Sequence, residues 1–323
     1  MSSIEVRPFH RRDREQLTDL VNGHAAAVVP GAGVSVAMML SHLERDPGEF
    51  IVGPWVGERV TLVAEENNRV AAAAHLLRYR TEDDVAAEYR GGGEIRWLLF
   101  WPEGPRHPSP CWTPGTRATA ELMTACLAQF GRWQVTGQSA GGELPVPGVY
   151  GVPEQWPHVS ALYEQAGFSH DGHTELVYLA RIADLPRIPA PIAGLQARRS
   201  VGLNGTRLSA VLDGEVIGYV EVEIRSEGER LARQPSWADV GNLGVTERYR
   251  RRKVATWLLG QAADWLALAG VDRLLDYSYL DGADATGQTY DNYRAFLGAL
   301  PFEILTRTRR GWTRKSADST ESR

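Results

Sequence analysis

The sequence predicts an α+β protein built from two similar halves. Strand-like segments with alternating apolar residues and amphipathic helical segments recur in the same order on both sides of a proline-rich stretch at residues 181–194. The 323 residues are 43% hydrophobic and 23% charged, a composition typical of globular domains rather than of disordered or collagen-like chains. This length is sufficient for two ordinary domains.

The first half begins with a short alternating strand at residues 4–8, followed by helical segments at 13–27 and 34–45. Two strand-like runs come next, separated by Asn67-Asn68, a dipeptide that favours a turn. The remaining segments predict, in order, a buried strand at 95–101, a helix at 117–130, a glycine- and proline-rich loop at 137–156, a short helix at 158–166 and a strand at 174–182.

The second half begins with strands at 207–212 and 215–225, joined by Asp213-Gly214 as in a hairpin. A strand at 238–245 then leads into a long helix that ends at Gly270, and a strand, a helix and a strand follow at 273–280, 291–300 and 302–310. We therefore expect an N-terminal domain over residues 1–180, a linker over 181–198, a C-terminal domain over 199–312 and a disordered polar tail over 313–323.

Charge and cysteine content exclude several classes of function. The formal charge is −5, which disfavours general nucleic-acid binding, and no apolar run approaches the roughly 18 residues of a membrane-spanning helix. The first residues are charged and lack an apolar signal segment, so we expect a cytoplasmic protein without membrane or nucleic-acid partners. Cys111 and Cys126 cannot form a disulfide framework, no spacing suggests a metal site, and Cys126 is expected to be buried as a small apolar residue.

The chemically informative stretch covers residues 243–259, where a strand passes through a basic turn into a helix. The first backbone N–H groups of a helix lack internal partners and, with the helix dipole, bind anions such as phosphate. Arg250, Arg251, Arg252 and Lys253 add positive charge to this turn. A run of charge is usually a solvated turn, but here its spacing is more specific than that. Lys253 is also unusual, because 33 of the 35 basic residues are arginine.

This stretch resembles the signature of the GNAT superfamily of acyl-CoA-dependent N-acyltransferases. In that signature a strand ends in Val, and x-x-x-x-Arg/Gln-x-x-Gly-x-Gly/Ala opens the helix. Val245, Arg250 and Ala255 match, whereas Lys253 replaces the first glycine. A side chain at this position would either narrow the pyrophosphate site or contact the cofactor phosphates.

The resemblance implies two GNAT-like domains, each with a mixed, mostly antiparallel central sheet flanked by helices. It implies acetyl-CoA or another acyl-CoA as cosubstrate, and a primary amine of a small molecule or peptide as the acceptor that attacks directly. The cofactor-binding residues that it implies are Leu243, Gly244, Val245, Arg250, Arg251, Arg252, Lys253, Val254 and Ala255.

A second family motif places a tyrosine beside the cofactor thiol, where it commonly protonates the leaving thiolate. In the first half, residues 161–168 match this motif with Tyr163 as the tyrosine, whereas residues 295–302 have Leu297 there and Pro301 in place of its glycine. The first half, however, lacks the phosphate-binding turn. We therefore expect the second half to bind the cofactor and the first half to be degenerate.

The family pattern also suggests catalytic residues. Asp239 stands where several GNAT enzymes have a base, and strand alternation predicts Asp239, Gly241, Leu243 and Val245 on one face. Asp239 is equally typical of a polar residue that starts a strand and pairs with an arginine. The remaining candidates are the Val245 N–H as oxyanion donor, Tyr290 and Tyr293 as acids or packing residues, and Glu221 and Glu223 as acceptor-binding residues or the solvated side of a hairpin.

Three functions are compatible with these features. The first is a tandem GNAT N-acetyltransferase. The second is a catalytically silent acyl-CoA-binding or regulatory protein, because Lys253, Leu297 and Pro301 depart from the working pattern. The third, a nucleic-acid contact by the basic turn, is disfavoured by the negative net charge. Loops near His107 and Trp112 are a further hypothesis for a wall of the acceptor site.

Overall fold

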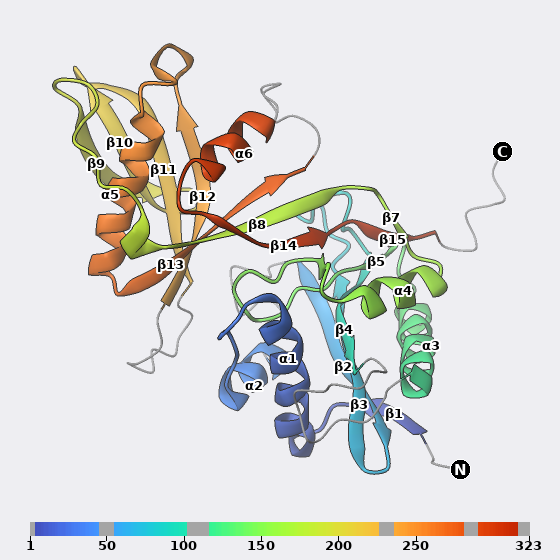
Figure 1. Cartoon of the computed structure of the whole chain (residues 1–323). Helices are drawn as coiled ribbons and strands as arrows, with labels where there is room; N and C mark the ends of the chain where they lie inside the picture. Colours follow the sequence, from blue (N-terminus) through green and yellow to red (C-terminus); the bar gives the residue numbers. More distant parts are fainter. Residues whose placement is uncertain (1–3, 45–54, 102–115, 226–235, 281–289, 316–323) are drawn as a thin grey trace. The chain divides into compact units, whose positions relative to one another are not determined.

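The structure is a computed structural model that describes residues 4–44, 55–101, 116–225, 236–280 and 290–315 (Figure 1). The chain forms two compact units. Unit 1 comprises residues 1–174 together with 308–323, and unit 2 comprises residues 175–307. No helix within the described ranges is both long and apolar enough to cross a membrane.

Unit 1 contains a seven-stranded sheet in the order β1-β2-β3-β4-β5-β15-β7, with β4 and β5 parallel. Helices α1 and α3 lie on opposite faces of this sheet (Figure 1). The predicted turn at Asn67-Asn68 is confirmed, because both residues have positive φ angles of 52° and 62° between two antiparallel strands. The elements of the unit are β1 (Ile4–Pro8), α1 (Arg14–Val28), α2 (Val36–Glu44), β2 (Val56–Glu66), β3 (Arg69–Tyr79), β4 (Gly93–Phe100), α3 (Thr116–Trp133), β5 (Gln138–Ala140), α4 (Pro157–Gln165), β7 (Ser169–His170) and β15 (Trp312–Arg314).

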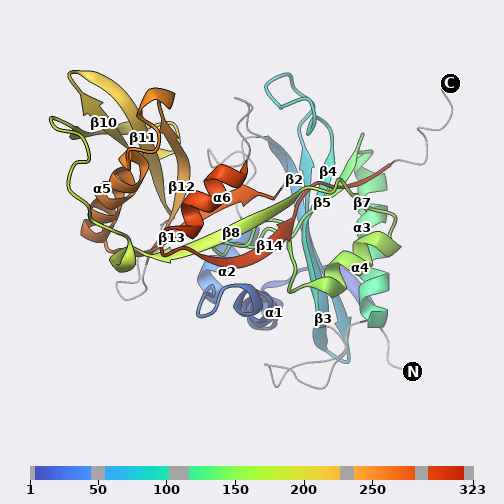
Figure 2. The same cartoon turned by 45° about the horizontal axis from the view of Figure 1, so that its top comes forward.

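Unit 2 is built on an eight-stranded sheet in the order β6-β14-β8-β13-β12-β11-β10-β9, in which β12 and β13 run parallel. Helices α5 and α6 bury their apolar residues in one common core on the same face of this sheet (Figure 2). Asp213 and Gly214 form the predicted hairpin turn, and Gly270, with φ 76°, follows the end of α5 as predicted. The elements are β8 (Thr174–Arg181), β9 (Gln196–Gly202), β10 (Gly205–Leu212), β11 (Glu215–Arg225), β12 (Ser236–Val245), α5 (Val254–Leu268), β13 (Val271–Tyr279), α6 (Tyr290–Gly298) and β14 (Glu303–Arg309). The last two residues of β14 belong to unit 1, where they pair with β6 (Val152–Pro153).

The ends of the two halves are exchanged between the sheets. Strand β8, which follows the last helix of the first half, lies beside β13 in the sheet of unit 2, whereas β15, the last strand of the chain, lies between β5 and β7 in unit 1. Residues 313–314, expected in a disordered tail, are therefore part of a strand, because β15 hydrogen-bonds to β5 and β7. Strand β9 begins at Gln196, inside the segment expected to be a linker.

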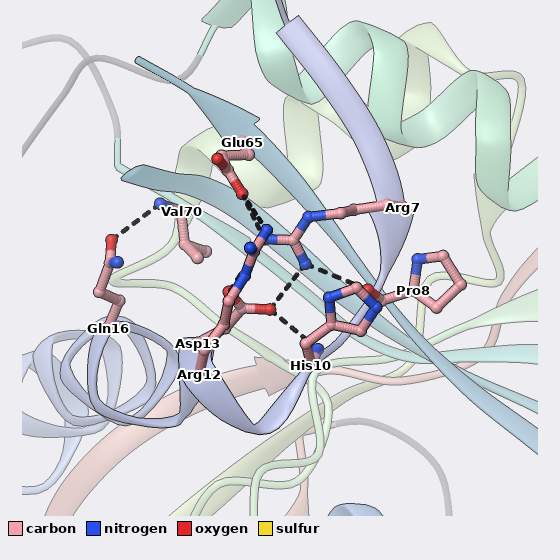
Figure 3. Close-up of polar contacts among 8 residues, drawn as sticks. All are labelled: Arg7, Pro8, His10, Arg12, Asp13, Gln16, Glu65 and Val70. Atoms are coloured by element: carbon pink, nitrogen blue, oxygen red, sulfur yellow. Dashed lines mark hydrogen bonds and ion pairs between the residues drawn. The ribbon is translucent and has the colours of Figure 1, made fainter. Parts of the chain in front are cut away.

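A buried ion-pair cluster joins the start of unit 1 to its sheet (Figure 3). Arg7 on β1 donates two hydrogen bonds to Asp13, at 2.7 and 2.9 Å, and a further one to Glu65 on β2. Asp13 also accepts a bond of 2.9 Å from the backbone N–H of His10. Burial would raise the pKa of Asp13, but the bonds from Arg7 and His10 outweigh this effect and lower it.

We expect Asp13→Asn to lower the free energy of unfolding of unit 1 by about 2–3 kcal/mol at pH 7, because buried Arg7 loses the carboxylate that accepts two of its hydrogen bonds and keeps only that of Glu65. The folded pKa of Asp13 is depressed, so its contribution is present above its unfolded pKa of about 4 and is lost as the pH falls through the folded pKa. Urea denaturation of Asp13→Asn and of the unchanged protein, at neutral and at acidic pH, measures this contribution.

The matched control is Glu15→Gln, since Glu15 is exposed and its carboxylate lies 3.7 Å from the guanidinium of Arg14. This substitution is expected to lower the free energy of unfolding by at most about 0.5 kcal/mol. The difference in the free energy of unfolding between Asp13→Asn and the unchanged protein must become smaller at acidic pH. A difference of equal size at both pH values would show that it does not come from the charge of Asp13.

Candidate functional site

Strands β12 and β13 pair only over their first residues and then separate. The parallel register runs from Ser236 to Asp239 on β12 and ends at Leu275 on β13. Beyond this point β12 stays paired with β11 up to Val245, and β13 stays paired with β8 up to Tyr279. The sheet of unit 2 therefore contains an open seam between two adjacent parallel strands, and we call the stretch of β12 and β13 beyond Asp239 and Leu275 the seam.

The backbone of Val245 presents its N–H group to this seam. The N–H of the next residue, Thr246, donates to the carbonyl oxygen of Ile217 on the β11 side at 2.9 Å. Successive N–H groups of an extended strand point to opposite edges, so the N–H of Val245 points away from β11. This orientation suits the predicted role of Val245 as a donor to a carbonyl oxygen held in the seam.

Asp239 lies at the closed end of the seam, and its side chain is on the other face of the sheet from the one predicted. A bulge in the pairing of β11 with β12 leaves Gly241 without a register partner. Val240 before the bulge and Leu243 and Val245 after it all contact the helix-covered core. The prediction that Asp239 shares a face with Leu243 and Val245 is therefore wrong, because the extra residue in the bulge shifts the alternation by one.

The carboxylate of Asp239 is buried, with 4% of the residue exposed, and Oδ1 accepts a hydrogen bond of 2.9 Å from the Tyr277 hydroxyl. Its cross-strand neighbour on β11 is Glu223, which is exposed. Glu221 has a different environment: it is fully buried and accepts bonds from Arg207 and from the N–H groups of Leu203 and Asn204. Glu221 therefore anchors the β9–β10 turn rather than facing solvent.

The basic turn leads from β12 into α5 through a short 3-10 helix at Glu247–Tyr249. Lys253, which replaces the glycine of the family signature, has φ 61° and ψ 16°, the left-handed conformation that glycine adopts without strain. Arg251 has a similar φ of 62°. The turn thus keeps a glycine-like backbone although a side chain is present.

The N-terminus of α5 presents backbone donors beside positive charge. The first helical N–H with an acceptor is that of Trp257, which donates to the carbonyl of Lys253 at 3.0 Å. The N–H groups of Val254, Ala255 and Thr256 precede it in the first turn of α5, where the helix itself offers no acceptor. Arg251, Arg252 and Lys253 are exposed around this terminus, and Arg250 donates to the carbonyl of Val245 at 3.2 Å. This arrangement suits an anion such as a pyrophosphate.

Replacing Lys253 by Gly is expected to raise the free energy of unfolding of unit 2 by about 1 kcal/mol, because glycine removes the strain of the left-handed conformation. If acetyl-CoA binds through the backbone N–H groups, its Kd should change by less than about three-fold, since the removed ammonium is exposed and the backbone is already in position. Denaturation and calorimetric titration measure the two effects.

Lys253→Ala is the matched control, because it removes the ammonium but keeps a Cβ, so no stabilisation is expected. A large loss of acetyl-CoA affinity in both variants would contradict the backbone interpretation and would mean that the ammonium contacts a phosphate.

Tyr293 on α6 contacts Asp276 on β13, a buried carboxyl group that was not among the residues predicted from the sequence. Its hydroxyl donates to Oδ2 of Asp276 on β13 at 2.6 Å. Burial raises the pKa of Asp276 to about 7, although the bonds from Tyr293 and the Tyr277 N–H oppose this. A lone acidic residue in the apolar run RLLDYSYL was the available signal.

The other tyrosines differ in their surroundings. The ring of Tyr290 packs against Tyr279 at 5.5 Å, and Leu297, in the family's tyrosine position, is fully buried. In unit 1, Tyr163 is also fully buried, and its hydroxyl donates to the carbonyl of Gly141 at 2.8 Å. The chain following β5 stays hydrogen-bonded to β4 there, through the N–H groups of Gly141 and Glu143. These contacts make Tyr163 a packing residue in unit 1.

The remaining candidates are outside the site. Cys126 is buried within α3, as predicted, and burial raises the pKa of its thiol. Cys111, His107 and Trp112 lie outside the described residues.

Comparison with known proteins gives matches for the fold and for part of the sequence. Residues 179–283 match the model of the acetyltransferase (GNAT) family. A tandem GNAT protein from the clavulanic acid biosynthesis pathway is similar in structure, with a TM-score of 0.63 and 16% identity over 98% of this chain and 100% of that one. A GCN5-related N-acetyltransferase from Sphaerobacter thermophilus has a TM-score of 0.57 and 15% identity over 97% and 95%. The search of curated proteins found no match.

Proposed function

We propose that unit 2 transfers an acetyl group from acetyl-CoA to a primary amine, because residues 179–283 match the model of the GNAT acetyltransferase family and the chain is similar in fold to a tandem GNAT protein. The observation that carries this proposal is the open seam between β12 and β13, which leads to the basic N-terminus of α5. The N–H groups of residues 254–256 and the side chains of Arg251 and Arg252 would bind the pyrophosphate. The acyl arm would then extend along Leu243, Gly244 and Val245.

The reaction needs a neutral amine, a polarised carbonyl and a proton for the departing thiolate. Asp239 is positioned at the closed end of the seam to accept the proton of the amine, directly or through water, with the Tyr277 hydroxyl orienting its carboxylate. The N–H of Val245 points into the seam, where it would donate to the thioester carbonyl. Tyr293 is favoured over Tyr290 as the acid, because its hydroxyl is held by a buried carboxyl group.

A catalytically silent acyl-CoA-binding protein is the second candidate. It is supported by Leu297, which is buried in the position where the family has its acid, and by Pro301 and Lys253 in positions where the family has glycine. In this function the seam and the basic turn would bind the same ligand, but no proton donor would act on the thiolate.

Two measurements separate these candidates. Calorimetric titration with acetyl-CoA tests both, and the absence of binding would contradict both. Release of free thiol from acetyl-CoA in a panel of primary amines, including small polyamines, aminoglycosides and peptides, then tests the enzyme. Binding without amine-dependent thiol release would support the silent protein.

A further inference from the structure

Asp276 is a buried carboxyl group in the apolar core of unit 2. Only 3% of the residue is exposed, and within the described part of the chain its donors are the Tyr293 hydroxyl and the N–H of Tyr277, the latter at 2.7 Å. No described arginine or lysine forms an ion pair with it. An ionised carboxylate in such surroundings is costly, so Asp276 is a candidate for a functional role.

The position of Asp276 relates it to the seam. It is the first residue of β13 after Leu275, the last residue that pairs with β12. Its side chain faces α6, from which Tyr293 reaches it, whereas the pair formed by Asp239 and Tyr277 lies on the opposite face of the sheet. One carboxyl–phenol pair is thus present on each face where the two strands separate.

We propose that Asp276 and Tyr293 form a proton relay that protonates the departing thiolate of CoA during acetyl transfer. This inference rests on the proposed function of unit 2 and assigns Asp276 a role as a positioning and proton-supplying residue behind Tyr293. Tyr293 lies four residues, about one turn, before Leu297 on α6, so both residues are on the same side of the helix. A phenol from the preceding turn therefore replaces the tyrosine that Leu297 lacks.

The proton balance of the step is as follows. The bond between the acyl carbon and sulfur breaks, and its electron pair goes to sulfur. When Asp276 is protonated, it donates to the Tyr293 oxygen, the reverse of the bond that its carboxylate accepts. The sulfur then takes the proton of the Tyr293 hydroxyl, and the phenolate oxygen takes the proton of Asp276, which becomes a carboxylate. Asp276 regains a proton from solvent before the next turnover, while the proton of the amine leaves through Asp239.

The pH dependence follows from the groups that face the pair. These are Tyr178 on β8, which is opposite Asp276 in the strand register, and Tyr293 and Arg294 on α6; Arg294 is held by the carbonyl of Tyr279 at 2.9 Å. The residues that β12 and α5 contribute to this core are apolar. Since the relay requires protonated Asp276, the thiolate-protonation step should slow as the pH rises through about 7.

The test compares kcat of Tyr293→Phe and Asp276→Asn with that of the unchanged protein, using two different acetyl donors as substrates. With acetyl-CoA, each variant is expected to lower kcat by about 100-fold, the usual effect of losing a general acid. With an acetyl aryl thioester whose thiol is acidic, the loss should be much smaller, because that thiolate leaves without a proton. Tyr178→Phe removes a neighbouring phenol and serves as the matched control, with kcat retained.

Infrared spectroscopy supplies a readout that does not depend on turnover. The band of the protonated carboxyl should titrate near neutral pH, be absent in Asp276→Asn and titrate at higher pH in Tyr293→Phe, where the carboxylate loses a donor. Unchanged kcat in both variants, or equal losses with both thioesters, would overturn the relay alone. An unchanged protein that releases no thiol with any amine would overturn the proposed function itself.

Discussion

Replacing Asp239 by Asn is expected to lower kcat for acetyl transfer by about 100-fold or more at neutral pH. The amide keeps the size of the side chain and can still accept the hydrogen bond from the Tyr277 hydroxyl, but it cannot take a proton from the amine. The Kd for acetyl-CoA should stay within about two-fold, because the proposed phosphate site is at the other end of β12. Thiol release and calorimetric titration measure the two quantities.

If Asp239 is the base, the loss of kcat in Asp239→Asn must depend on pH. As the pH approaches the pKa of the acceptor, a growing share of the amine is neutral in solution, so the variant should regain rate relative to the unchanged protein. Asp272→Asn is the matched control, since Asp272 is an exposed carboxylate on β13 and should leave kcat unchanged. A loss in Asp239→Asn that is constant over the pH range would identify a structural role instead.

The local features of the fold could be predicted from the sequence because short-range chemistry determines them. Asn67-Asn68 and Asp213-Gly214 adopt positive φ angles in hairpin turns, and these residue types tolerate that conformation well. The apolar spacing of α5 and the glycine after it predicted its length. The basic turn was likewise located from the order strand, turn, helix.

The face of the sheet on which Asp239 lies could not be predicted, because it depends on how β12 pairs with its neighbour β11. The bulge at Gly241 arises from the register of β12 against β11, and nothing within residues 238–245 requires one extra residue. The pairing of Asp276 with Tyr293 likewise joins a strand to a helix that begins 14 residues later, at Tyr290, so neither segment alone indicates it. Alternation gives the correct face only while the ladder is regular.

The exchange of terminal strands is the least local feature of the fold. The sequence predicted a last strand followed by a polar tail, whereas β15 pairs with Ala140 and His170 more than 140 residues earlier in the chain. Its single large apolar residue, Trp312, was the last residue of the predicted C-terminal domain, and a tryptophan directly before a polar tail was the available signal for a further strand.

Trp312→Ala is therefore expected to destabilise unit 1 by about 4 kcal/mol, although residue 312 follows the whole of unit 2 in the chain. The side chain is fully buried, with its ring 5.8 Å from that of Tyr163 and 5.2 Å from that of His170. Hydrogen exchange should show faster opening of β4 and α4 in unit 1. The amides of α5 in unit 2 should keep their protection.

The reason for this large effect is packing rather than hydrogen bonding. The indole N–H of Trp312 has no acceptor among the described residues, so Trp312→Phe should retain most of the contacts and cost only about 1–1.5 kcal/mol. Thr313→Ala alters an exposed position on the same strand and should be nearly neutral. Equal losses in Trp312→Phe and Trp312→Ala would show that the indole ring itself, and not buried apolar volume, connects β15 to unit 1. Loss of protection in α5 as well would mean that the two units unfold together.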